Sequence, residues 1–164
     1  ARRQRQMCIR DSVYGRSKAL GEIINNKDLT IRTSIIGPEL KDNGEGLFHW
    51  FMHQSGKICG FRTAVWGGVT TLELAKAIDY ALDSGTTGLV HLSNGIGISK
   101  YDLLCMFEEI WQKQNVEITS CDANGVDKSI KKSLRFDYEV PSYHYMLEEQ
   151  AIWMKKYIDL YTSY

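Results

Sequence analysis

The segment VYGRSKALGE at residues 13–22 and the segment LTIRTSIIGP at residues 29–38 decide the fold. The first is typical of a helix. The second is typical of a strand, because β-branched residues dominate it and Gly37-Pro38 closes it. On the helix, Tyr14 and Lys18 stand four residues apart, so we expect their side chains to share one face.

That pairing has a chemical consequence. An ammonium next to a phenol stabilises the phenolate, so the phenol can donate or accept a proton near neutral pH. The interconversion of a carbonyl and an alcohol requires such a proton transfer, and the same ammonium can hydrogen-bond a ribose hydroxyl. By itself the spacing also fits an ordinary exposed helix pair, so the surrounding residues have to decide between the two interpretations.

Helix and strand patterns alternate along the rest of the chain. Capping signatures at residues 70–73 (TTLE) and 99–102 (SKYD) predict two helix starts. Helices are expected over residues 13–24, 47–53, 70–82, 99–111 and from 141 onward, and strands over residues 29–36, 60–65, 89–92 and 116–119. This alternation indicates an α/β chain with a largely parallel sheet.

The composition excludes several classes of protein. The 164 residues include 20 Lys+Arg and 20 Asp+Glu and are 43% hydrophobic, which is ordinary for one globular domain and excludes disorder. No apolar stretch approaches the 18 residues of a transmembrane helix, so we expect no membrane span. None of the cysteines (Cys8, Cys59, Cys105 and Cys121) forms a Cys-x-x-Cys pair, which predicts reduced thiols in a cytoplasmic protein.

No metal site is expected either. His49 and His53 have a spacing that can ligate zinc, but the aromatic residues between them favour a packed helix. Since the thiols are isolated in the sequence, they add no zinc motif.

Residues 1–12 differ in character from the rest, with four Arg and two Gln. They back-translate to an adapter used in transposon-based DNA sequencing libraries, so we interpret residues 1–12 as an artefact outside the native protein. Without the four Arg and one Asp of this segment, 16 basic and 19 acidic residues remain, a net charge of −3. This balance predicts no nucleic-acid partner. We also expect the natural protein to extend upstream of Val13.

The residues around Tyr14 and Lys18 resemble the extended short-chain dehydrogenase/reductase superfamily, in which a Tyr-x-x-x-Lys helix leads into a strand that ends near Gly-Pro. Within it, YGRSK at 14–18 and RTS at 32–34 look most like dTDP-4-dehydrorhamnose reductases. Further segments are similar in the same order: WGGVTTLELA at 66–75, GLVHL at 88–92 and SKYDLL at 99–104. The resemblance implies an α/β fold: the C-terminal part of a Rossmann-type NAD(P)-binding domain over residues 13–38, then a small mixed α/β substrate-binding lobe over residues 39–164.

The resemblance also implies roles for individual residues. Tyr14 would protonate the sugar C4 oxygen as hydride arrives from NAD or NADP, and Lys18 would assist it and hold the nicotinamide ribose. Thr33 and Ser34 would lie beside the nicotinamide as further cofactor-binding residues. The Gly-rich phosphate turn and the Ser or Thr that completes the family's catalytic set belong upstream. We therefore expect this chain alone to be inactive.

Four residues are candidates for substrate binding. Ile35 stands where these reductases usually carry a Trp that contacts the sugar, and Thr70 lies at the family's strand-to-helix junction. Arg62 could clamp a diphosphate with two parallel hydrogen bonds, as could Arg135.

The function expected from the resemblance is NAD(P)-dependent reduction of a nucleotide-sugar 4-ketone in deoxysugar or surface-polysaccharide biosynthesis. Two alternatives stay open at this point: an epimerase or dehydratase of the same superfamily that keeps NAD bound, and a non-catalytic relative that binds a dinucleotide and regulates a partner. The Tyr-rich segment at 143–164 is a candidate homodimer contact.

Overall fold

The computed structural model describes residues 13–41, 43–122 and 125–164, so the predicted adapter segment at 1–12 lies outside the described residues. The helices are α2 (Val13–Leu20), α3 (Leu47–Met52), α4 (Thr71–Asp83), α5 (Lys100–Trp111), α6 (Tyr143–Lys156) and the 3-10 turn η1 (Ile158–Leu160). The strands are β1 (Leu29–Arg32), β2 (Ile35–Ile36), β3 (Gly56–Phe61), β4 (Val65–Trp66), β5 (Val69–Thr70), β6 (Gly88–His91), β7 (Ile98–Ser99), β8 (Val116–Cys121) and β9 (Asp127–Lys128).

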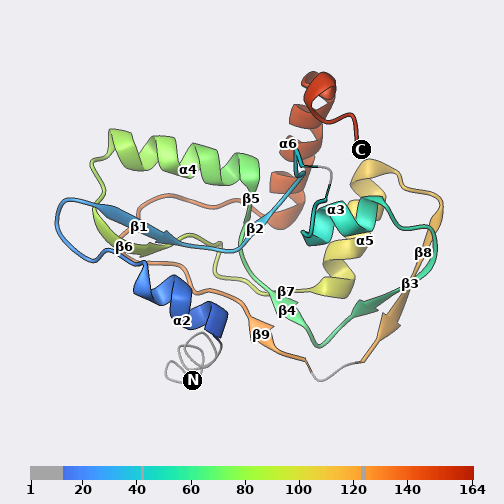
Figure 1. Cartoon of the computed structure of the whole chain (residues 1–164), viewed down its shortest axis with the longest axis horizontal. Helices are drawn as coiled ribbons and strands as arrows, with labels where there is room; N and C mark the ends of the chain where they lie inside the picture. The colour runs from blue at the N-terminus through green and yellow to red at the C-terminus, as the bar shows by residue number, and fades with distance from the viewer. Residues whose placement is uncertain (1–12, 42, 123–124) are drawn as a thin grey trace.

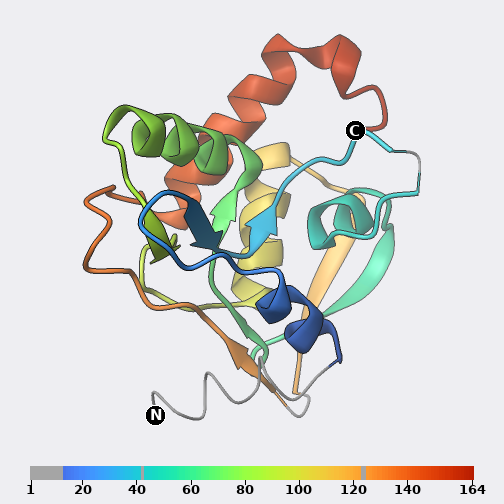
Figure 2. The same ribbon diagram turned by 60° about the vertical axis from the view of Figure 1, so that its left-hand side comes forward.

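Parallel strand pairs form the framework, as the alternation of helices and strands predicts. β1 pairs with β6 from Leu29↔Gly88 to Arg32↔His91, and β2 pairs with β5. Helix α4 connects β5 to β6 and lies on one side of the β1–β6 pair, with α2 on the other side (Figures 1 and 2). Each of these two pairs therefore takes one strand from each side of residue 38.

A second group of strands lies next to α5 (Figure 1). β3 and β8 run parallel over six residue pairs, from Gly56↔Val116 to Phe61↔Cys121. β4 pairs antiparallel with β7 and parallel with β9, which gives a mixed three-stranded sheet.

The predicted helix starts are confirmed by their caps. The Thr70 hydroxyl accepts a hydrogen bond from the backbone N–H of Glu73, and the Ser99 hydroxyl accepts one from that of Asp102. These bonds satisfy N–H groups that the first turn of a helix leaves without an intrahelical acceptor.

Two predicted boundaries are wrong, and the strand expected at 29–36 is divided into β1 and β2 by Thr33 and Ser34. The first helix ends at Leu20 rather than at residue 24, because Gly21 is a poor helix former and Asn25 turns the chain. The Asn25 side-chain oxygen accepts hydrogen bonds from the backbone N–H groups of Lys27 and Asp28. The strand expected at 60–65 is instead β3, which begins at Gly56 and ends at Phe61.

The core lies where α5, α3 and α6 meet. Phe48, Phe51 and Phe107 are each at most 1% exposed. Phe48 packs edge-on against Phe107, with ring centroids 5.3 Å apart, and also contacts Trp111. Among the residues described, no helix has both the length and the apolar character that a membrane crossing needs.

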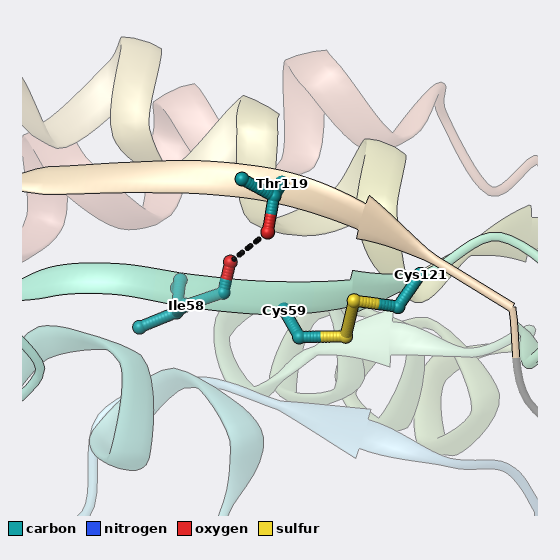
Figure 3. Close-up of a disulfide and its surroundings, with 4 residues drawn as sticks. All are labelled: Ile58, Cys59, Thr119 and Cys121. Carbon is teal, nitrogen blue, oxygen red and sulfur yellow. Dashed lines mark hydrogen bonds between the residues drawn. A yellow bond between two sulfur atoms is a disulfide. The ribbon is translucent and has the colours of Figure 1, made fainter.

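The expectation of reduced thiols is wrong for two cysteines, because Cys59 and Cys121 form a disulfide (Figure 3). In the β3–β8 register, Cys59 lies opposite Thr119, two residues before Cys121. The two cysteines are therefore diagonal neighbours on one face of the pair, with Cα atoms 5.8 Å apart. Their separation of 62 residues in sequence hides this proximity.

We predict that this bridge stabilises the chain. Reduction, or the substitution Cys121→Ser, should lower the free energy of unfolding by about 4 kcal/mol, since a loop of this length loses entropy in the unfolded state when it is closed. Urea unfolding with and without dithiothreitol measures the difference. Cys105→Ser is the matched control and should leave the effect of reductant unchanged. An equal midpoint in both conditions would contradict the prediction.

Candidate functional site

Thr33 and Ser34 lie between β1 and β2, at the carboxyl end of the parallel strands. The Thr33 hydroxyl donates a hydrogen bond to the Leu92 carbonyl (2.9 Å), just past the end of β6. The Ser34 carbonyl accepts from the backbone N–H of Val69 (2.9 Å). Thr33 is thus fixed at the carboxyl ends of β1 and β6, the kind of edge where ligands bind in parallel α/β sheets, and Ser34 is fixed at the start of the β2–β5 pair.

Gly68 makes this junction possible. A Cβ atom at Gly68 would lie 2.0 Å from the Ser34 carbonyl oxygen, which is far inside van der Waals contact. Only glycine therefore lets the 67–69 segment approach Ser34 closely enough for the hydrogen bond from Val69. The sequence analysis did not single out Gly68, although the Gly67-Gly68 pair before β5 is a signal of close backbone approach.

Tyr14 and Lys18 lie on α2 on one face, as helical spacing predicts. The Lys18 Nζ atom is 5.8 Å from the centroid of the Tyr14 ring. The Tyr14 side chain is 73% exposed, so its hydroxyl is accessible to a ligand. This arrangement can move a proton to or from a molecule bound against the exposed face of α2.

An ion pair joins the end of α2 to β1. Arg32 donates two hydrogen bonds to the Glu22 carboxylate, from Nε at 2.6 Å and from a terminal nitrogen at 2.5 Å. Hydrogen bonding to Glu22 raises the pKa of Arg32 above its ordinary value. On the paired strand β6, the His91 Nε2 atom lies 3.4 Å from the same guanidinium. Burial, and then the charge of Arg32, lowers the pKa of His91.

The predicted substrate residues do not form one cluster. Ile35 follows Ser34 and is 51% exposed, so its side chain is available to a ligand. Thr70 lies at the same junction, but it is 2% exposed and its hydroxyl caps α4. Arg62 lies at the ends of β3 and β8, where its guanidinium is 4.1 Å from the centroid of the Tyr101 ring.

His49 and His53, the residues considered for a metal site, contact aromatic side chains. His49 Nδ1 is 2.7 Å from the Tyr164 hydroxyl, and the His49 and His53 rings stack at 4.3 Å. Within residues 13–41, 43–122 and 125–164, no three His, Cys, Asp or Glu side chains are grouped to hold a metal. Arg135 lines an open cavity of about 490 Å³ at the amino ends of β1 and β6, away from Thr33 and Ser34.

Solved structures with the same fold are enzymes of nucleotide-sugar metabolism. A dTDP-4-dehydrorhamnose reductase from Bacillus anthracis in complex with NADP superposes with a TM-score of 0.70 at 19% identity, over 86% of this chain and 55% of that chain. A dTDP-glucose 4,6-dehydratase from the same organism in complex with NAD gives 0.64 at 17% identity, over 93% and 55%. A UDP-N-acetylglucosamine 4-epimerase from Methanobrevibacter ruminantium in complex with UDP-N-acetylmuramic acid gives 0.63 at 16% identity, over 90% and 55%.

The chain thus spans about half the length of each of these enzymes. At these identities the likeness shows the fold alone, and the predicted α/β fold, that of part of a Rossmann-type domain, is confirmed. No protein-family model and no curated protein matches the sequence.

The close approach at Gly68 predicts a sensitive position. Gly68→Ala should destabilise the chain by about 1–3 kcal/mol, because the added methyl group meets a backbone oxygen that cannot move without breaking the Val69 hydrogen bond. Chemical denaturation of the two proteins measures the loss. In the control Gly21→Ala, the added Cβ has no neighbour closer than 3.6 Å, so a much smaller change is expected. Equal effects of the two substitutions would refute the argument.

The lowered pKa of His91 predicts acid sensitivity. The folded state binds a proton at His91 less readily than the unfolded state does. The contribution of His91 to the free energy of unfolding is therefore complete above pH about 6.5, the ordinary histidine value. That contribution falls as the pH drops below 6.5 toward the lower folded value. Between pH 7.5 and 5.5, the parent chain should therefore lose more unfolding free energy than His91→Gln. Parallel losses in both proteins, measured by urea titration at each pH, would exclude this role for His91.

Proposed function

We propose that the protein to which this chain belongs is an NAD(P)-dependent reductase of a nucleotide-sugar 4-ketone. The observation that carries the proposal is the Tyr14–Lys18 pair on the exposed face of α2, in a chain whose fold is that of nucleotide-sugar enzymes. The reaction would belong to deoxysugar or surface-polysaccharide biosynthesis in the cytoplasm. The Tyr-rich segment at 143–164 remains our candidate for a homodimer contact.

The residues present fit one end of a nicotinamide dinucleotide. Lys18 offers an exposed ammonium for ribose hydroxyls, and Thr33 and Ser34 line the carboxyl end of the parallel strands. The sequence contains no Gly-x-Gly-x-x-Gly turn to hold the pyrophosphate. We therefore assign the nicotinamide and its ribose to this chain and the phosphates to the upstream half of the protein, and we expect the chain alone to be inactive.

Tyr14 would handle the proton of the reaction. When bound, the dinucleotide supplies the hydride that reduces the sugar ketone. The Tyr14 hydroxyl donates its proton to the C4 oxygen as negative charge develops there, and the Lys18 ammonium stabilises the phenolate that remains. In this scheme Thr33 and Ser34 limit the positions that the nicotinamide can take.

Two side chains would contact the nucleotide sugar. The exposed Ile35 presents an apolar surface next to Ser34, and Arg62 can form two parallel hydrogen bonds to a diphosphate. Because the Thr70 hydroxyl is buried in the α4 cap, we leave Thr70 out of the substrate contacts that we propose.

A second candidate function is epimerisation or dehydration of a nucleotide sugar, which is favoured by the similar superpositions of a dehydratase and an epimerase. The two classes differ in how they use the dinucleotide. A reductase consumes added NADPH or NADH, whereas an enzyme that regenerates its cofactor releases nicotinamide dinucleotide when it is purified and denatured. A protein that binds a dinucleotide but turns over no nucleotide sugar would be the regulatory relative.

The central test is Tyr14→Phe in the full-length protein, recovered by sequencing the source DNA upstream of Val13 with a different adapter. Turnover of a nucleotide-sugar 4-ketone should fall by about 100-fold or more, because the phenyl ring has no proton to donate. Dinucleotide affinity, measured by fluorescence titration, should be nearly unchanged. Tyr145→Phe, at an exposed tyrosine on α6, is the matched control. Undiminished turnover in Tyr14→Phe would refute the catalytic role.

A further inference from the structure

We propose that Glu22 and Arg32 are positioning residues, whose ion pair holds α2 against β1 and so sets the position of Tyr14 and Lys18 relative to Thr33 and Ser34. The inference rests on the function proposed above. It assigns a task to two residues that the sequence analysis did not select, and neither of them has to touch the substrate.

Helix α2 has little apolar anchorage in the structure. Among its residues Gly15 is buried, while Val13 is 86% and Leu20 is 88% exposed. Apolar burial normally fixes a helix against its sheet. Since α2 buries so little, polar contacts have a larger share in fixing its position.

Those polar contacts lie directly after the helix. The Glu22 and Arg32 side chains are only 16% and 28% exposed, and their two parallel hydrogen bonds fix orientation as well as distance. Next to them, the Thr30 hydroxyl donates to the Ile23 carbonyl (2.7 Å) and accepts from the Ile23 N–H (3.2 Å). The end of α2 is therefore joined to two residues of β1 on the same side of the strand.

The placement of Arg32 links this anchor to the candidate site. Arg32 is the last residue of β1 and directly precedes Thr33, and it lies opposite His91 in the strand register. One strand end thus carries both the anchor of α2 and the residues expected beside the nicotinamide. Loss of the anchor would therefore change the position of α2, and of Tyr14 on it, relative to the Thr33–Ser34 segment.

The consequence for catalysis is specific. Tyr14 and Lys18 lie on the same helix, so loosening the anchor moves both residues together and leaves their mutual geometry intact. A displacement of about 1 Å can cost about 100-fold in rate. Loss of the ion pair should therefore lower kcat.

The experiment compares Glu22→Gln with Glu149→Gln in the full-length protein. Glu149 pairs with Lys76 at 2.6 Å between α4 and α6, so its substitution removes an ion pair of similar length away from Tyr14. We expect Glu22→Gln to lower kcat by about 10- to 100-fold with little change in KM. Glu149→Gln should leave kcat unchanged. The double variant Glu22→Arg with Arg32→Glu exchanges the two charges and should recover part of kcat. If Glu22→Gln lowered kcat only through a general loss of stability, this exchange would not restore it.

A second measurement separates failure of this inference from failure of the proposed function. In the 164-residue chain, amide hydrogen exchange of residues 13–22 should accelerate in Glu22→Gln and not in Glu149→Gln. Unchanged exchange in Glu22→Gln would overturn the positioning role even if no substrate is ever found. Accelerated exchange with an unchanged kcat in an active full-length enzyme would overturn the catalytic consequence and leave the proposed function standing.

Discussion

The parallel pairing of β1 with β6 and of β2 with β5 is the constraint on which the rest of the structure depends. Strands that run parallel need a crossover connection, and here α4 is the last helix of the connection from β1 to β6. Thr33 lies next to Leu92 because β1 and β6 end together, and Ser34 lies next to Val69 because β2 and β5 begin together. The positions of Thr33 and Ser34 thus follow from the strand topology.

The start of α4 shows how the polar groups of this framework are satisfied. Gln150 of α6 accepts hydrogen bonds from the Thr71 hydroxyl (2.9 Å) and the Leu72 N–H (3.1 Å), and it is only 2% exposed. The equally buried Glu73 carboxylate accepts a hydrogen bond from the Tyr138 hydroxyl at 2.6 Å. Burial, together with Glu73, raises the pKa of Tyr138, so this phenol keeps its proton and remains a donor. Such pairing offsets the cost of burying polar groups beneath the crossover helix.

Helix-capping signals in the sequence were reliable, whereas contacts between residues distant in sequence could not be predicted from it. Capping residues gave the starts of α4 and α5 to within a residue. A cap is local, because the hydroxyl of the capping residue accepts from the backbone N–H three residues later. The Cys59–Cys121 bridge and the Glu22–Arg32 pair depend on strand register and on where a turn returns the chain, which no local pattern reports. The predicted face shared by Tyr14 and Lys18 is visible in the structure because it too is local. Their catalytic role remains a prediction.

The proposed site divides into residues expected to handle protons and residues expected to select the sugar. Reduction, epimerisation and dehydration of a nucleotide sugar all involve charge that develops on a sugar oxygen, and one phenol–ammonium pair can serve each of them. The anchor from Glu22 to Arg32 acts on that pair as a unit and is independent of the sugar. Choice among the three reactions must then come from residues that face the substrate. In this chain the candidates for such residues are the exposed Ile35 and Arg62, and not the residues of α2.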